Sequence, residues 1–330
     1  MNGIKRNEIG SEFWDVPIKE VNNNLFNKDT AWFLSGRSAL RAIIQEVKKN
    51  KDVSSAAIPS WCCDSMITPF LLENLTVTFY PTFAPDDVKQ EIASRCDITL
   101  AMDYFGYQSN TEFSEGIVIR DLTHSVFSNN HHDASYYFGS LRKWCGFYTG
   151  GFAVGIDGVE GTSDEYVALR QEAMQKKNDY INGKNNNKEY LNIFNNAEEL
   201  LDSCEIASAA ERDIELANQL DVDFVVNRRR SNAAILLDAF ADIAVFEEIR
   251  PLDCPLFVPI RVRNRDELRK LLIGHEIYCP VHWPLTELHA INEDDKRIYQ
   301  DELSLVCDQR YSEKDMYRIV EEVKRGLSLC

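Results

Sequence analysis

A lysine and an aspartate near the middle of the chain have the types and spacing needed for chemistry on a bound group. Asp121 directly follows the strand-like run 117–120, and Lys143 comes shortly after the strand-like run 135–138. In open α/β sheets, ligands collect at the carboxyl ends of the strands. A lone carboxylate at the end of a buried strand needs a cationic partner, because burying an unpaired charge is costly. The pair therefore predicts a site where an amine and a carboxylate act together.

Pyridoxal 5′-phosphate (PLP) is a cofactor that requires these two groups. It forms a Schiff base with a lysine, and an acid beside its pyridine nitrogen keeps the ring protonated so that it can accept electrons. We expect Lys143 to form the Schiff base and Asp121 to hold the ring nitrogen. Alone, Asp121 could instead cap a helix. His124 could reach the phenolic oxygen of the ring, or it could satisfy a backbone carbonyl in the core.

The phosphate group of PLP needs further donors, and two segments provide them. Ser140, three residues before Lys143, can place its hydroxyl on the phosphate. The backbone N–H groups of Gly36 and Arg37, with the hydroxyl of Ser38, open a predicted helix whose positive dipole end suits a dianion. A glycine at this point permits close approach of the phosphate. Ser38 could also cap the helix, and the two roles are compatible.

The order of elements between residues 30 and 155 indicates how these residues are positioned. Short apolar runs alternate with amphipathic stretches, the pattern of strands and crossover helices in an α/β sheet sandwiched between helices. Apolar residues recur at i, i+3, i+4 and i+7 within residues 38–49, so we expect a helix with one buried face there. The strand-like runs are 55–59, 76–80, 98–104, 117–120, 135–138 and 152–156.

The second half of the chain predicts a helical region and then a smaller α/β unit. The asparagine-rich residues 178–196 are poor helix material and predict a loop. Ser312 and Asp315 resemble a capping box that starts the last helix, and Gly326 is expected to stop it. Three further elements are expected: a helix at 233–240, a strand at 256–262 and a helix at 266–272.

The domain organisation follows from these elements. At this length about two domains are expected. The predicted parts are an N-terminal segment at 1–30 that packs with the small domain, a large PLP-binding domain at 31–225 and a small C-terminal domain at 226–330.

Composition excludes several classes of protein. The 330 residues include 36 basic and 53 acidic side chains, and the net charge of -17 repels a polyanion, so nucleic-acid binding is not expected. No apolar stretch approaches the roughly 18 residues of a membrane span. Residues 1–13 lack the apolar middle of a secretory signal. We therefore expect a cytoplasmic protein whose nine cysteines stay reduced.

Two clusters of possible metal ligands give only weak signals. Cys62 and Cys63 are adjacent rather than spaced as C-x-x-C, and no second cluster at zinc-finger spacing accompanies them. His131, His132 and Asp133 lie in an asparagine-rich turn, where neighbouring histidines are more often solvated than metal-bound. No metal is expected.

Five segments together carry a family resemblance. They are the turn 35–40, the strand end 58–63, Asp121 with His124, Lys143 ahead of Gly150 and Gly151, and the histidine-bearing segment 277–284. In this order they resemble the DegT/DnrJ/StrS family of sugar aminotransferases over most of the chain. The resemblance implies the fold of type I PLP-dependent transferases, in which a large domain with a mainly parallel sandwiched sheet is joined to a smaller C-terminal α/β domain. It also implies a homodimer.

The chain departs from this family at two positions of the expected cofactor site. Arg37 replaces the usual threonine in the phosphate turn, which leaves the hydroxyl contacts to the two serines named above. Cys63 stands where many members place the aromatic residue that stacks on the pyridine ring. Cys63 stays a candidate cofactor contact, and Trp61 or Tyr104 would then supply the stacking face.

The residues that would bind substrate carry weaker signals. Many members contribute an asparagine from the neighbouring subunit to the phosphate, and the chain has no clear copy of that motif, so Asn195 is only a guess. Tyr104 is a candidate substrate contact. Arg229 could steer an anionic substrate or belong to a solvated helix face. His282 and Trp283, in the histidine-bearing segment, could bind substrate or simply pack the small domain.

The resemblance also implies a reaction. The expected enzyme moves an amino group from L-glutamate to a nucleotide-linked keto-sugar, in surface-polysaccharide or amino-sugar biosynthesis, and Lys143 shuttles a proton. Related sugar dehydratases replace this lysine with histidine, which argues against dehydration. A scaffold that binds PLP or a sugar nucleotide without turnover is the alternative. A nicotinamide dehydrogenase is not supported, because Gly155, Gly158 and Gly161 lack the G-x-G-x-x-G order.

Overall fold

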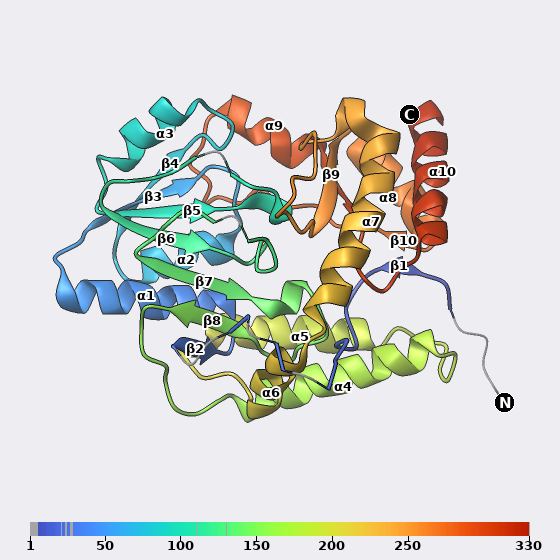
Figure 1. Cartoon of the computed structure of the whole chain (residues 1–330), viewed down its shortest axis with the longest axis horizontal. Helices are drawn as coiled ribbons and strands as arrows, with labels where there is room; N and C mark the ends of the chain where they lie inside the picture. The colour runs from blue at the N-terminus through green and yellow to red at the C-terminus, as the bar shows by residue number, and fades with distance from the viewer. Residues whose placement is uncertain are drawn as a thin grey trace.

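A seven-stranded sheet forms the centre of the computed structural model, which describes residues 6–20, 22–23, 25–26, 29–109, 111–129 and 131–329. The strand order is β2-β8-β7-β6-β5-β3-β4 (Figure 1). The five neighbouring strands from β7 to β4 are parallel, whereas β8 is antiparallel to both β7 and β2. The sheet is therefore mainly parallel, as predicted. Its strands are β2 (Thr30–Phe33), β3 (Ser55–Pro59), β4 (Thr76–Tyr80), β5 (Ile98–Met102), β6 (Ile117–Asp121), β7 (Tyr136–Ser140) and β8 (Gly151–Val154).

Burial on both faces explains the apolar composition of the middle strands. Every residue of β5 and β6 is buried, even the charged Arg120. Helices cover both faces of a parallel sheet, so its central strands have continuous apolar runs instead of alternating ones. The predicted strands at 55–59 and 76–80 match β3 and β4 in both bounds. The other four predicted strands overlap β5 to β8, and β2 was not predicted.

Helix α1 (Gly36–Asn50) brings its N-terminus to the sheet. The helix contacts β7 and β8. Ser35 is its N-cap, and the Ser35 side chain accepts a hydrogen bond of 3.1 Å from the backbone N–H of Ser38. Two shorter helices, α2 (Asp64–Leu72) and α3 (Asp86–Ala93), follow β3 and β4. The predicted apolar stripe of α1 is confirmed, since these residues are buried: Leu40, Ile43, Ile44 and Val47.

The region after the sheet is more helical than predicted. Helices α4 (Asp164–Ile181) and α5 (Tyr190–Ser203) pack against each other, and α6 (Glu211–Gln219) follows. The prediction of a loop at 178–196 was therefore wrong except at its centre, between the ends of α4 and α5. An apolar stripe outweighs the low helix propensity of asparagine here. The buried residues of α5 are Tyr190, Phe194, Ala197 and Leu201.

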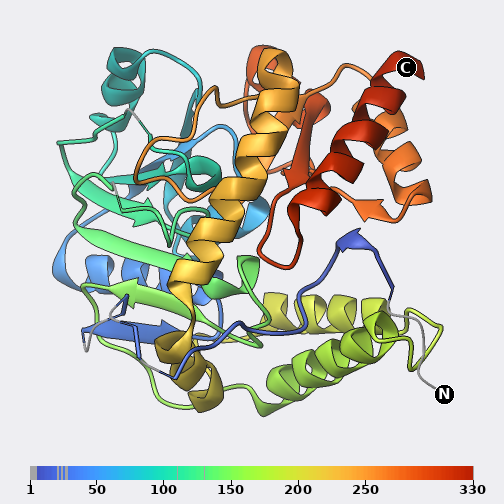
Figure 2. The ribbon, with the colours of Figure 1, turned by 45° about the vertical axis from the view of Figure 1, so that its right-hand side comes forward.

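The C-terminal part is a second α/β unit. Strands β9 (Phe257–Arg261) and β11 (Glu302–Val306) are antiparallel. The strand β1 (Ile9–Gly10) pairs in parallel with β10 (Ile277–Tyr278), so this part of the N-terminal segment contacts the unit. In both views β1 lies between the C-terminal unit and the α4–α5 pair (Figures 1 and 2). The helices of the unit are α8 (Arg265–Gly274), α9 (Glu293–Asp301) and α10 (Glu313–Leu329).

Two predicted helix boundaries differ from the structure. Helix α7 spans Val222–Phe240, far longer than the predicted 233–240, so the proposed domain boundary after residue 225 falls inside it. The last helix, α10, continues through Gly326, where a stop was predicted. A Cβ atom on Gly326 would lie 2.3 Å from the Cδ1 of the buried Leu268. The glycine thus permits close packing of α10 against α8.

A helix crosses a membrane only if it is both long and apolar. Within the residue ranges given above, none of them combines enough length with enough apolar character to cross a bilayer.

Candidate active site

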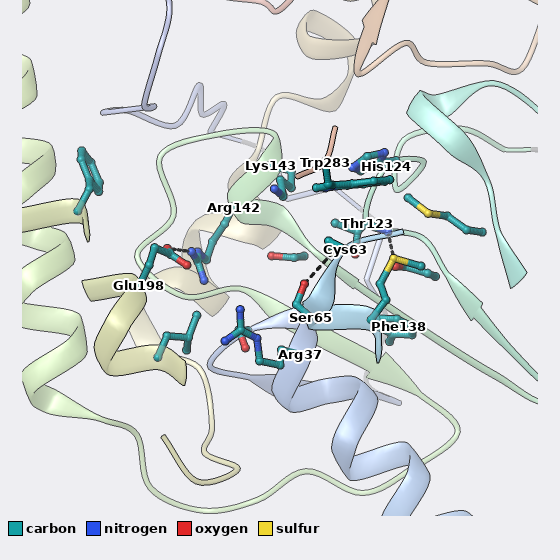
Figure 3. A pocket seen from close by; sticks show the side chains of 18 of the residues that line it. Arg37, Cys63, Ser65, Thr123, His124, Phe138, Arg142, Lys143, Glu198 and Trp283 are labelled. Carbon is teal, nitrogen blue, oxygen red and sulfur yellow. Dashed lines mark hydrogen bonds and ion pairs between the residues drawn. The ribbon is translucent and has the colours of Figure 1, made fainter. Parts of the chain in front are cut away.

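A cavity of about 400 Å³ lies where the carboxyl ends of several strands meet the start of α1 (Figure 3). Met102, Asp121 and Ser140, the last residues of β5, β6 and β7, all line it. Gly36, the first residue of α1, lines it as well. Because parallel strands end at the same edge of a sheet, residues distant in the sequence become neighbours here.

Lys143 lines this cavity with an unengaged amine. It ends the single 3-10 turn Leu141–Lys143 that follows β7. Leu141 is fully buried, and its backbone N–H donates to the carbonyl of Gly150 at 2.9 Å, which anchors the turn. The side-chain amine of Lys143 makes no hydrogen bond or ion pair with any described residue, and it lies beside Trp283 (Figure 3). The amine is thus available to a bound molecule.

Asp121 is a buried carboxylate on the same wall. Only 3% of the residue is exposed, and its Oδ1 accepts a hydrogen bond of 2.7 Å from the backbone N–H of Thr123. Burial raises the pKa of Asp121 to about 6, although the hydrogen bonds from Thr123 and the charge of Lys143 act in the opposite direction. A cation that entered the cavity would stabilise the ionised form of this carboxylate.

Two aromatic side chains from different parts of the chain form another wall. His124 and Trp283 both line the cavity, and their rings stack with centroids 5.5 Å apart at 24°. Burial, together with the charges of His282 and Lys143, lowers the pKa of His124 well below its ordinary value, so the imidazole is neutral. Its Nδ1 atom is buried without a hydrogen-bond partner among the described residues.

The start of α1 places some of the expected phosphate ligands in the cavity but not all of them. Gly36, Arg37 and Ser140 line it. Ser38 does not, because its hydroxyl lies 3.1 Å from that of the N-cap Ser35 and takes part in the cap. Ser35 lines the cavity in its place, and its position immediately before the helix was a signal that could have identified it.

The expected stacking residues lie elsewhere. Trp61 is fully buried and stacks on Tyr104, with ring centroids 4.9 Å apart at 8°. The Tyr104 hydroxyl donates to the carbonyl of Trp61, and neither residue lines the cavity. Cys63 does line it, with its Sγ 2.9 Å from the Oγ of Ser65. Of the aromatic candidates predicted at this site, His124 and Trp283 face the cavity.

Arg229 and His282 do not reach the cavity either. Arg229 is fully buried, where its guanidinium donates to Gln309 Oε1 and to the carbonyl of Leu256, each at 2.8 Å. These bonds join α7 to the C-terminal unit, and they hold the guanidinium away from the cavity where substrate steering was predicted. His282 does not line the cavity, and its ring packs against His124 and Trp283, which do. Its Nδ1 is 2.9 Å from the Oγ of Ser304.

Sequence reasoning missed a charged group on the side of the cavity facing α4 and α5. Arg142, Arg170 and Glu198 line it, and so does Asn195, the one guess from this region. Arg142 donates to Glu198, and Arg170 Nη1 lies 3.6 Å from Glu198 Oε1. The signal was hidden because α5 was predicted as a loop, although Arg142 directly precedes Lys143.

The described residues offer no metal site. No group of three or more histidine, cysteine, aspartate or glutamate side chains in the described ranges is arranged to hold a metal ion. His131 instead places its Nδ1 2.8 Å from Asp103 Oδ2.

The comparisons with known proteins show which fold this is. No family model and no curated protein matches the chain. Among solved structures, Spr1654 of Streptococcus pneumoniae, described as a sugar aminotransferase in its PLP form, superposes with a TM-score of 0.65 at 12% identity, covering 98% of this chain and 99% of that one.

Two further structures agree with this comparison. A DegT DnrJ EryC1 StrS aminotransferase from Brucella abortus superposes with a TM-score of 0.60 at 15% identity, covering 90% of this chain and 85% of that one. DesI, solved in the presence of its TDP-sugar product, gives 0.62 at 13% identity, with 91% and 82% covered. The chain therefore has the fold of the sugar aminotransferases along nearly its whole length.

Proposed function

We propose that this protein is a PLP-dependent aminotransferase that acts on sugars. The observation that carries the proposal is that the unengaged amine of Lys143, the buried carboxylate of Asp121 and the N-terminus of α1 line a single cavity. These groups match the three parts of PLP, which are an aldehyde, a basic ring nitrogen and a phosphate. The shared fold supports the same assignment.

The residues of the cavity suit the division of roles that such a reaction needs. When bound, PLP supplies a ring that accepts electrons from the bonds of an attached amine. Asp121 would hold the proton on the ring nitrogen. Its carboxylate is buried, and Lys143 is the one cation among the groups that shift its pKa. Lys143 Nζ would bind the aldehyde carbon and, once released, would carry a proton to and from the substrate carbon.

The phosphate would be held where the start of α1 lines the cavity. The backbone N–H groups of Gly36 and Arg37 are at the positive end of the α1 dipole, where an anion is stabilised. The hydroxyl of Ser140 lies on the same wall. These three residues, together with Arg142, are the proposed phosphate ligands.

The proposed substrates are L-glutamate as amino donor and a nucleotide-linked keto-sugar as acceptor. Both carry anionic groups, which suits a cavity with Arg37, Arg142 and Arg170 on its walls in an otherwise acidic protein. The fold shared with DesI supports a sugar acceptor. We also propose that the enzyme works in the cytoplasm as a homodimer and serves the synthesis of surface polysaccharide or other amino sugars.

The test uses the purified chain with added PLP. We expect an absorbance band from cofactor bonded to Lys143, and a shift of that band when L-glutamate is added. Borohydride reduction followed by peptide mass spectrometry should place the cofactor on Lys143, and the Lys143→Ala variant should show neither band nor modified peptide. A chain that binds PLP but responds to no amino donor would instead support the scaffold alternative.

A further inference from the structure

The carboxylate of Glu198 lies near three arginines that line the cavity. Glu198, on α5, is bonded to Arg142 and lies 3.6 Å from Arg170. Arg37, at the start of α1, lies below Arg142 in Figure 3, and its charge also acts on Glu198. Arg37 also pairs with Asp202, whose side chain is 67% exposed. Glu198 is therefore the carboxylate that pairs directly with these guanidinium groups, whereas Glu12, which also lines the cavity, acts on Arg142 and Arg170 through its charge.

The arginines need such a partner when the cavity holds no ligand. The side chains of Arg142 and Arg170 are only 15% and 5% exposed, and an unpaired guanidinium at such sites loses hydration without compensation. Burial raises the pKa of Glu198, but the charges of Arg142 and Arg170 outweigh this effect, so the carboxylate stays ionised.

A phosphate group would bind the same guanidinium groups. The planar fork of arginine binds carboxylate and phosphate oxygens in the same bidentate geometry. Arg37 is the second residue of the helix whose N-terminus faces the cavity, and Arg142 is adjacent to Lys143. A phosphate bound at that N-terminus would therefore be attracted by the same arginines that pair with Glu198.

We propose that Glu198 is a built-in competitor for the phosphate site, which pairs with Arg142 in the ligand-free protein and gives up this guanidinium to the phosphate of an incoming ligand. The inference rests on the proposed function, since the ligand is PLP. The backbone of α5 is fixed by the buried Phe194 and Leu201, so only the side chain moves. With 45% of that side chain exposed, there is room for it to do so. The exchange lowers phosphate affinity and makes binding of the cofactor reversible.

The experiment measures dissociation constants of the full, PLP-free chain for inorganic phosphate and for PLP by isothermal titration. The variant Glu198→Gln keeps the size of the side chain and removes its charge. We expect it to bind phosphate about fivefold more tightly, which corresponds to about 1 kcal/mol. PLP affinity should rise in the same direction. In an Arg142→Gln background the gain from Glu198→Gln should disappear, because the contested guanidinium is absent.

The matched control is Glu199→Gln, which makes the same change of charge at the next, exposed position of α5 outside the cavity. It should leave the phosphate dissociation constant within twofold of the wild-type value. If the ion pair instead only positions Arg142 for the phosphate, Glu198→Gln will bind phosphate more weakly than wild type. That result, or equal affinity, or no phosphate binding by either protein, overturns the proposal.

A second variant covers the case in which Glu198→Gln does not fold. Glu198→Asp keeps the charge but shortens the reach to Arg142, so phosphate affinity should again rise. A lower phosphate affinity than that of the wild type would contradict the proposal that Glu198 competes with phosphate. Failure of the proposed function gives a different result. In that case the wild-type chain binds phosphate, Glu198→Gln binds it more tightly, and PLP does not react with Lys143.

Discussion

Burial gives Asp121 its chemical character. The residue is the last of β6, and only 3% of it is exposed. A carboxyl group in this position has a pKa near 6 because ionisation is opposed by the loss of water. Burial would strengthen the interaction of this carboxylate with a protonated ring nitrogen. In the ligand-free protein the same burial lowers the free energy of unfolding, because the ionised carboxylate has no such partner. This cost can be measured.

The variant Asp121→Asn should stabilise the ligand-free protein at neutral and alkaline pH. The pKa in the folded state, about 6, is above that of an unfolded aspartate, so the wild type loses stability as the pH rises from about 4 to 6 and does not regain it above. The gain in unfolding free energy from the substitution should be on the order of 1 kcal/mol greater at pH 8 than at pH 5. Urea unfolding at the two pH values checks this.

The exposed Asp133 provides the control, since Asp133→Asn removes a carboxylate outside the cavity and should show no such difference. Parallel pH profiles for Asp121→Asn and the wild type would contradict the assignment of the raised pKa to this residue. The same variant should bind PLP less tightly, because an amide cannot neutralise a protonated ring nitrogen.

Among the elements, the contact between α1 and β8 positions the phosphate site. A Cβ atom on Gly151 of β8 would lie 2.1 Å from the carbonyl oxygen of Ser35 and 2.8 Å from the backbone nitrogen of Gly36. Both neighbours are backbone atoms that cannot move independently. Only a glycine lets the strand approach the helix N-terminus this closely.

The variant Gly151→Ala should therefore destabilise the protein and displace the start of α1. The expected loss of unfolding free energy is about 3 kcal/mol, the upper range for overpacking, with a parallel loss of phosphate affinity. Gly158→Ala is the matched control, because its new Cβ would meet only the Ala31 Cβ at 3.8 Å. A Gly151→Ala protein as stable as Gly158→Ala would show that the two elements can separate without cost. Chemical denaturation and phosphate titration measure both quantities.

At the scale of the whole molecule, a buried ion pair connects the N-terminal segment to helix α4. The side chains of Lys177 on α4 and Glu8 are 0% and 1% exposed and bonded to each other. Burial lowers the pKa of Lys177 to about 8, although Glu8 acts in the opposite direction. The adjacent strand β1 pairs with β10 of the C-terminal unit. One short segment thus links two parts of the molecule that border the cavity.

Removing one charge of this pair should be expensive. Glu8→Gln leaves a buried lysine without its carboxylate, and the expected loss of stability is about 3–5 kcal/mol. The exposed Glu20→Gln should change stability by less than about 0.5 kcal/mol. In the double variant Glu8→Gln/Lys177→Met most of the loss should be recovered, because no fully buried charge is left unpaired. Lys188, which also pairs with Glu8, keeps 32% of its side chain exposed and stays hydrated. Thermal unfolding of the four proteins tests the argument, and an unaffected Glu8→Gln would refute it.

Local sequence patterns were sufficient for the strands and for the residues at their ends. The apolar runs of β3 to β6 predicted the central sheet. Parallel strands must end at a common edge, so placing Asp121 and Ser140 together followed from topology alone. Lys143 and the start of α1 were identified in the same way, from residues next to these elements.

Tertiary structure decided what lies around those residues. Helix α5 forms because its apolar stripe packs on α4, despite its asparagines, and this packing brings Glu198 to Arg142. Arg229 makes its hydrogen bonds with residues distant in the sequence, which spacing does not reveal, whereas Ser38 takes part in the helix cap with Ser35. The sequence by itself determined the strands and the lysine and aspartate that follow them, since both can be predicted from patterns of neighbouring residues. The charged wall and the aromatic wall depend on contacts between distant residues, and only the folded chain specifies them.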